Sequence, residues 1–231
     1  EKLGHGFGGR VICCSESELE EYEKIGIEAS YVNNGICMKS APSYPGRPSQ
    51  GKFRVITCGR IVPQKNPSLF NEIAQYFEEF SQFEFVWAGD GDAKELLTAK
   101  NIHITGWLAK EEARELVATS DLYLSTSLYE GLSFAVLEAL ALRRPVLLSK
   151  CVGNKDVIKS GLNGGLFESS QEAILKVLHF YNNREMLQVM GEFSHQICET
   201  EFDMQRNFES YRHIYSNNAA VSEQNPAWAL N

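Results

Sequence analysis

Residues 121–146 read DLYLSTSLYEGLSFAVLEALALRRPV, and this stretch decides the fold. The pattern predicts a buried strand at Leu122–Ser125, a polar turn, a helix over 134–141 and a second strand over 145–148. A strand, a helix and a strand in this order form a βαβ unit, in which the two strands run parallel. The turn Tyr129–Ser133 then directs free backbone N–H groups and the positive end of the helix dipole toward a ligand.

Two carboxylates mark this stretch, Glu130 in the turn and Glu138 inside the helix. Eight helical positions separate two side chains by about 12 Å along the axis and by about 80° around it. The two acids therefore cannot act as a close pair on one atom, but they can hold two parts of one elongated ligand. An acid beside a helix start that attracts anions favours a ligand with both phosphates and hydroxyls.

The rest of the chain repeats the alternation of strands and helices. Further strands are expected at FRVITC (53–58), FEFVWAG (83–89) and 102–105. Asn66 and Pro67 are typical of a helix start, as a capping residue and a proline in the first turn. Other helices are expected at 93–100, 109–119, 170–181, 185–198 and 203–215. This alternation predicts an α/β fold, a doubly wound parallel sheet with helices on both faces.

The residues before this alternation form a separate region. RVICC (10–14) is typical of a strand, SESELEEYEKIG of a helix, and Tyr31–Val32 of a short second strand. The run SAPSYPGRPSQG (40–51) contains three of the seven prolines and breaks every periodicity, so we interpret it as a linker or surface crossover. No initiator Met opens the sequence, which we expect to be a piece of a longer protein.

Charge and composition exclude several classes of function. A formal net charge of −8 argues against sequence-independent nucleic-acid binding, which requires a basic surface. No apolar run approaches the roughly 20 residues that span a bilayer, and we expect a cytoplasmic protein. Peripheral membrane association through a missing part stays open. The six cysteines lack metal-site spacing, so reduced, mostly buried thiols are expected, with a disulfide or metal role as the alternative.

The first regular strand ends in a loop that carries two cations. In an open parallel sheet, ligands bind beyond the carboxyl ends of the strands. The loop over 58–66 leaves its strand through Gly59 and contains Arg60 and Lys65. A guanidinium and an ammonium group together can grip a diphosphate. The alternative is that both are ordinary solvated surface cations.

Two more strand-end loops contain possible ligand contacts. Gly89–Asp92 is a tight turn that either admits a ligand close to the backbone or simply precedes a helix. In Gly106–Leu108, backbone groups can read the edge of a base while a side chain packs on its ring. The alternative for Trp107 is ordinary packing.

Glu138 lies in a helix segment that is apolar nearly all round. A carboxylate in such surroundings needs a partner, because burying it unpaired costs several kcal/mol. That partner is either the diol of a bound ligand or one of the nearby cations Arg143, Lys150 and Lys155. For Glu130 the alternative to a ligand contact is a turn carboxylate that the helix dipole stabilises.

These residues belong to a longer series of motifs in a fixed order: CGRIVPQKN (58–66), WAGDGD (87–92), HITGWL (103–108), SDLYLSTSLYEGLSFAVLEALA (120–141), PVLLS (145–149) and VGNKDVI (152–158). The series resembles the C-terminal, donor-binding half of retaining family-4 glycosyltransferases of the GT-B fold, the glycosyl transferases group 1. The resemblance covers about residues 53–215 and places the family's E-x7-E signature on Glu130 and Glu138. Residues 1–35 are similar to the last strand and helix of the family's N-terminal half.

The resemblance implies a division of the chain into four parts. Residues 1–38 would be the remnant of the end of the N-terminal lobe, and 39–52 the crossover. Residues 53–216 would form a Rossmann-like domain that binds the nucleotide-sugar donor, and 217–231 a C-terminal tail. The missing N-terminal lobe would carry the acceptor site, so weak nucleotide binding and little or no transfer are expected of this chain alone.

The resemblance also implies a role for each candidate residue. Arg60 and Lys65 would clamp the nucleotide diphosphate beside Gly59. Glu138 would accept hydrogen bonds from the ribose hydroxyls, and Glu130 would contact the donor sugar as the catalytic residue. The remaining contacts, to the sugar or β-phosphate and to the base, would come from Gly131, Leu132, Ser133, Trp107 and Leu108.

The implied reaction transfers a sugar from a UDP-, GDP- or ADP-sugar to a glycan, lipid or other acceptor, with retention of configuration and without a required metal or cofactor. It belongs to surface polysaccharide, glycolipid or storage-glucan synthesis. The family often has Gly, Gly and Glu at the positions of Arg143, Asn154 and Asp156 in this sequence. Two other functions stay open: a non-catalytic nucleotide-binding or assembly module, and a nucleotide-sugar epimerase with the GT-B architecture.

Overall fold

The computed structural model describes residues 11–38 and 51–224, with side chains up to Ser216. Its main sheet contains β3 (Phe53–Cys58), β4 (Phe83–Ala88), β5 (Ile102–Ile104), β6 (Leu122–Ser125), β7 (Val146–Ser149) and β8 (Gly164–Phe167). The spatial order is β5-β4-β3-β6-β7-β8, and every neighbouring pair is parallel. The order reverses between β3 and β6, which places a switch point where the loops after these two strands diverge.

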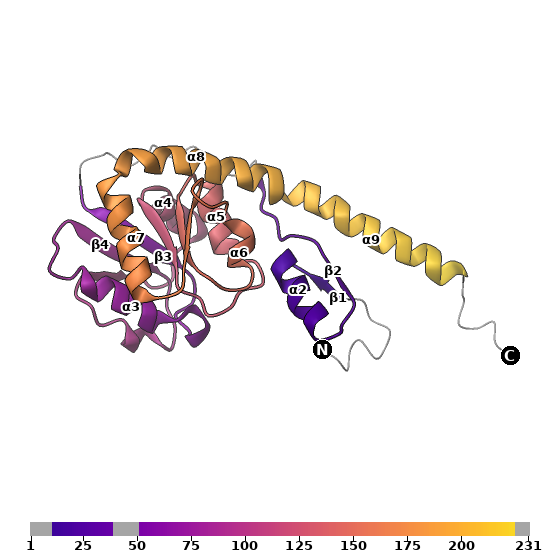
Figure 1. Ribbon diagram of the computed structural model, residues 1–231, viewed down its shortest axis with the longest axis horizontal. Helices are drawn as coiled ribbons and strands as arrows, with labels where there is room; N and C mark the ends of the chain where they lie inside the picture. Colours follow the sequence, from indigo (N-terminus) through magenta and orange to yellow (C-terminus); the bar gives the residue numbers. More distant parts are fainter. Residues whose placement is uncertain (1–10, 39–50, 225–231) are drawn as a thin grey trace.

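Helices cover both faces of this sheet (Figure 1), so the expected doubly wound α/β fold is confirmed. On one face the core includes apolar side chains of α3 (Pro67–Tyr76) and α7 (Ser170–Asn182). On the other face it includes those of α4 (Lys110–Ala118) and α5 (Phe134–Ala141). The strands between are buried on both sides, which explains why they read as continuous apolar runs rather than as alternating ones.

The long helix α8 (Arg184–Glu201) closes the domain by packing against both layers. Its residues Leu187 and Met190 belong to the core on the α3 face, whereas Ile197 and Cys198 belong to the core on the α5 face. Helix α9 (Met204–Gln224) follows and extends away from the body of the domain (Figure 1).

Residues 11–36, here called the N-terminal unit, form a small separate layer. It consists of β1 (Val11–Cys13), α2 (Glu16–Lys24) and β2 (Ala29–Tyr31), and its two strands are parallel. The unit lies beside α6 (Asn154–Val157), as Figure 1 shows. Its last residue, Ile36, is tied to the junction of α8 and α9: its amide donates to Phe202 O at 2.9 Å and its carbonyl accepts from Met204 N at 3.0 Å.

The structure differs from the sequence-based expectation in four places. The expected helix over 93–100 is only a short 3₁₀ turn, Lys94–Leu96, because Asn71 Oδ1 accepts the Thr98 and Ala99 amides at 2.7 and 2.8 Å and holds the chain out of a helix. Strand β8 and helix α6 were not expected. Helix α9 continues past Ser216 to Gln224. The expected crossover and the last tail residues lie largely outside the described residues.

The start of α3 confirms the predicted capping pattern. Asn66 adopts a left-handed backbone with φ of 50°, and its side chain accepts a hydrogen bond from Leu69 N at 3.3 Å. Pro67 occupies the first helical position, where its missing N–H costs nothing. This cap fixes where the loop after β3 ends, and therefore where Lys65 lies.

The loops after β3 and β4 touch through backbone atoms. Gly89 has a φ of +150°, and a Cβ added there would lie 2.1 Å from Gly59 O. The buried Trp87 donates from Nε1 to the same carbonyl at 2.9 Å. Gly89 is thus required both for its backbone conformation and for the space that Gly59 occupies.

We expect Gly89→Ala to lower the free energy of unfolding by about 2–4 kcal/mol, because it combines backbone strain with a clash against a fixed carbonyl. Gly161→Ala is the matched control, since Gly161 also has a positive φ but nothing lies within 4 Å of its added Cβ. That control should cost only about 1 kcal/mol. Urea denaturation of both variants measures the difference, and equal losses would contradict the close approach at Gly89.

Candidate functional site

Hydrogen bonds join the loop after β3 to the loop after β6. Leu128 N donates to Gln64 O at 2.8 Å, and Gln64 Nε2 donates to Tyr129 O at 3.0 Å. Thr126 Oγ1 lies 2.8 Å from Lys65 O and 3.1 Å from the next carbonyl. Four contacts thus fix the two loops together at the switch point of the sheet.

Lys65 and Glu130 meet as an ion pair across this junction. Lys65 Nζ lies 2.6 Å from Glu130 Oε1, and the two side chains are only 21% and 8% exposed. The aliphatic part of Lys65 passes over Gly59, whose added Cβ would lie 3.7 Å from Lys65 Cε. No described residue donates a hydrogen bond to Glu130 Oε2, and Lys65 Nζ has further N–H donors. The pair can therefore accept one hydrogen bond and donate others to a ligand.

Arg60 follows Gly59 in the same loop as Lys65 and has an exposed side chain. Within the described parts of the chain, its guanidinium forms no hydrogen bond or ion pair. The loop that carries Arg60 is held at Gly59 by the Trp87 contact described above. One free cation and one paired cation thus share a fixed loop.

Glu138 lies on helix α5, which packs on one face of the sheet. Burial, and secondarily the charge of Glu138, raises the pKa of the thiol of Cys58, the last residue of β3, to about 12. The cations weighed as alternative partners do not pair with it. Arg143 binds Glu192 at 3.1 Å, Lys150 binds Glu168 at 2.5 Å, and Lys155 forms no ion pair with Glu138.

Within the residues that the structure describes, Glu138 therefore lacks a hydrogen-bonded partner. It is half-buried on a helix whose neighbouring positions are buried. A carboxylate in this position favours a ligand with donor hydroxyls, because pairing compensates for its partial desolvation.

The loop Glu130–Ser133 contributes main-chain groups rather than side chains. Leu132 is only 4% exposed and packs in the core, and its carbonyl accepts a hydrogen bond from Asn34 Nδ2 at 2.9 Å. Ser133 is the N-cap of α5 but makes no side-chain cap bond. The first amides of α5 are therefore available, together with the positive end of its dipole.

Trp107 and Leu108 lie two strands away from β3, after the edge strand β5. Neighbouring strands are about 4.8 Å apart, so this loop is on the order of 10 Å from the Lys65 loop. Trp107 is 67% exposed, which excludes the alternative that it is an ordinary core residue, whereas Leu108 is partly buried against the core. The distance suits the far end of an elongated ligand.

Sequence reasoning missed the residues that hold the site together. Gln64 and Thr126 join the two loops, and Asn34 reaches the loop after β6 from a distant part of the chain. The buried Tyr123 hydroxyl accepts from Cys58 N at 3.4 Å at the base of the site. Gln64 and Thr126 could have been found as polar residues that flank Lys65 and Glu130 in the sequence, but no local pattern marks Asn34.

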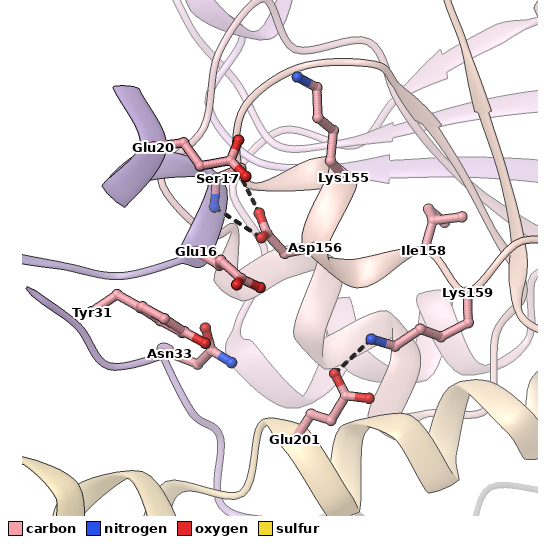
Figure 2. A pocket seen from close by; sticks show the side chains of 10 residues that line it. All are labelled: Glu16, Ser17, Glu20, Tyr31, Asn33, Lys155, Asp156, Ile158, Lys159 and Glu201. Carbon is pink, nitrogen blue, oxygen red and sulfur yellow. Dashed lines mark hydrogen bonds and ion pairs between the residues drawn. The ribbon is translucent and has the colours of Figure 1, made fainter. Parts of the chain in front are cut away.

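Other features of the described residues lie outside this site. No group of His, Cys, Asp and Glu in these residues has the arrangement of a metal site. No described helix is long and apolar enough to cross a membrane. All six cysteines are described, and none forms a disulfide. A cavity of about 320 Å³ lies between the N-terminal unit and α6, lined by side chains that Figure 2 shows.

Comparisons with known proteins agree with this geometry. Residues 45–196 match the family model of glycosyl transferases group 1. The UDP-Gal:alpha-D-GlcNAc-diphosphoundecaprenol alpha-1,3-galactosyltransferase of Escherichia coli is 25% identical over 232 aligned positions, which cover 89% of this chain and 59% of that protein. The sulfoquinovosyl transferase SQD2 of Arabidopsis thaliana is 28% identical over 156 positions, covering 64% of this chain and 30% of that protein.

Solved structures have the same fold. Anabaena Alr3699/HepE, determined in complex with UDP and glucose, superposes with a TM-score of 0.80 at 19% identity, covering 93% of this chain and 65% of that one. Sucrose-phosphate synthase from Thermosynechococcus elongatus gives a TM-score of 0.77 at 15% identity, covering 92% and 59%. At these identities the likeness is one of fold alone.

The coupling between Lys65 and Glu130 is measurable by a double-mutant cycle with Lys65→Met and Glu130→Gln. Lys65→Met leaves a largely buried carboxylate unpaired, so we expect a loss of about 2 kcal/mol in the free energy of unfolding and a coupling of about 1–2 kcal/mol. The exposed pair Glu21 and Lys24, cycled as Glu21→Gln and Lys24→Met, is the control and should show no measurable coupling. Equal coupling in the two cycles would contradict the buried pairing.

Proposed function

We propose a function on the premise that this chain belongs to the glycosyl transferases group 1 family, as its match over residues 45–196 establishes. The chain is the donor-binding part of a retaining, hexosyltransferase-type enzyme that transfers a sugar from a nucleoside diphosphate sugar. The observation that carries this proposal is the half-buried pair of Lys65 and Glu130, which presents unused donors and an unused acceptor beside the free Arg60.

The diphosphate binds between Arg60 and Lys65. Arg60 supplies a planar fork of donors that suits phosphate oxygens, and Lys65 supplies a point charge that Glu130 holds in place. Charge builds up on the diphosphate when the bond to the sugar breaks. Cations that are already fixed stabilise that charge without reorganising during the reaction.

Glu130 contacts the donor sugar through its second carboxylate oxygen. Since Oε1 binds Lys65, the pair stands at the junction between phosphate and sugar. The amides of Gly131, Leu132 and Ser133 and the start of α5 support the β-phosphate or the sugar from the same side. This arrangement needs no metal, because protein cations and helix amides neutralise the phosphate charge.

The nucleoside extends from the diphosphate toward the other edge of the site. Glu138 accepts hydrogen bonds from the ribose hydroxyls, which supplies the partner it lacks within the described chain. The main chain at Trp107 and Leu108 reads the base. The spacing of about 10 Å between this loop and the Lys65 loop matches an extended nucleotide.

Transfer itself requires more than this chain. The chain spans 59% of the length of the Escherichia coli relative, and we assign the acceptor site to an N-terminal lobe outside it. Residues 1–38 belong to the end of that lobe, 39–52 to the crossover, 53–216 to the donor domain and 217–231 to a tail. Four further points stay predictions: little or no turnover by this chain alone, a role in polysaccharide, glycolipid or glucan synthesis, a cytoplasmic location, and peripheral membrane association.

Titration calorimetry with UDP, GDP and ADP tests the binding site. We expect one of these nucleotides to bind the chain, and Arg60→Ala and Glu138→Gln each to weaken its affinity about 10- to 100-fold, because each removes charged hydrogen bonds to the ligand. Arg143→Ala and Glu192→Gln are matched controls, since this cation and this acid pair with each other away from the site, and should leave affinity unchanged. A scaffold without this site would bind none of the three nucleotides, or would bind them with the same affinity in all variants.

A further inference from the structure

The N-terminal unit packs directly on the loop Glu130–Ser133. A Cβ added to Gly131 would lie 2.5 Å from Cys14 Sγ and 3.5 Å from Glu18 Oε2, so the loop backbone fits against β1 and α2. Asn34 Nδ2 donates to Leu132 O at 2.9 Å from the end of the unit. Residues far apart in the sequence thus enclose the loop from one side.

A second attachment joins the unit to α6. Ser17 N donates to Asp156 Oδ1 at 3.0 Å, and Ser17 Oγ donates to Asp156 Oδ2 (Figure 2). Ser17 Oγ also accepts from Gly153 N at 2.8 Å. Ser17 is buried, and its hydroxyl and amide hold both the start of α6 and the residue before it. We call these three hydrogen bonds the Ser17 clamp.

Gly153 contacts both the Ser17 clamp and the loop Glu130–Ser133. A Cβ added to Gly153 would lie 2.2 Å from Gly131 O and 3.0 Å from Glu130 O. The backbone of Gly153 is therefore in close contact with two carbonyls of the loop. Movement of Gly153 toward the loop would press on the carbonyls of Glu130 and Gly131, because no space separates them.

Around the clamp, polar contacts join the unit to α6, in addition to the packing of Cys14 and Ile36 against the core cluster that includes Val157. The cavity of about 320 Å³ adjoins Ser17 and Asp156, and its other lining residues are mostly charged or polar (Figure 2). On its far wall Lys159 binds Glu201 at 2.9 Å, an exposed pair that adds little. The hydrogen bonds of Ser17 therefore contribute direction to the placement of the unit on this side.

We propose that Asp156, Ser17 and Asn34 are positioning residues that fix the loop Glu130–Ser133 for the donor sugar, an inference that rests on the proposed function for the role of that loop. The N-terminal unit is thus part of the donor site, not only the end of another lobe. Any movement of the unit relative to the sheet changes the position of Glu130. Binding of the sugar and placement of the unit are therefore coupled.

The test uses the full 231-residue chain and the variants Asp156→Ala and Asn34→Ala. Hydrogen exchange is first measured without ligand. We expect the amides of Leu128 and Leu137, whose hydrogen bonds to Gln64 O and Ser133 O frame the loop, to exchange about tenfold faster in both variants, while the amides of β3 and β6 keep their protection. Asp156→Glu should restore protection, because it keeps both acceptor oxygens. Glu20→Ala, which removes an exposed acid that lines the same cavity, should change nothing.

Calorimetry with UDP-glucose and with UDP then separates positioning from general stability. Affinity for UDP-glucose should fall about five- to tenfold in Asp156→Ala, affinity for UDP less, and Asp156→Glu should recover both. Unchanged exchange at Leu128 and Leu137, or a rise spread equally over β3 and β6, overturns the inference. Wild-type chain that binds none of UDP, GDP and ADP refutes the proposed function, while the exchange data still decide whether the clamp positions the loop.

Discussion

The site depends on one interaction, the ion pair of Lys65 and Glu130 across the switch point of the sheet. Lys65 follows β3 and Glu130 follows β6, which are neighbours only because the strand order reverses between them. A lysine held by a carboxylate loses less freedom on binding a phosphate than a free one would. The same pairing gives a largely buried carboxylate a charged partner and leaves its second oxygen without a donor from the described chain.

Around this pair, the remaining site is built mainly from backbone. The carbonyl of Gly59 is fixed by Trp87, and the loop between β6 and α5 is fixed by Gln64 and Thr126 near its start and by Asn34 near its end. Each of these residues acts through hydrogen bonds to main-chain atoms. The exposed side chains that remain, chiefly Arg60 and Trp107, lie on supports that are already rigid.

The sequence predicted what depends on local pattern and missed what depends on distant contacts. Periodicity and residue type predict the parallel sheet, the Asn66 cap and the position of Glu138 among apolar residues of a helix. The pairing of Lys65 with Glu130 joins residues 65 positions apart, and the Ser17–Asp156 contact joins residues 139 apart, so no local pattern contains either. The predicted helix over 93–100 was wrong for the same reason, because Asn71, which lies in α3, accepts hydrogen bonds from the amides of Thr98 and Ala99.

The most direct measurement is a crystal structure of this chain with UDP-glucose. The account predicts phosphate oxygens within hydrogen-bond distance of Arg60 and Lys65, ribose hydroxyls on Glu138 and a glucose hydroxyl on Glu130. Lys65 should keep its contact with Glu130 while it donates to the phosphate. A diphosphate bound away from Arg60 and Lys65, for instance in the cavity of Figure 2, would contradict the account.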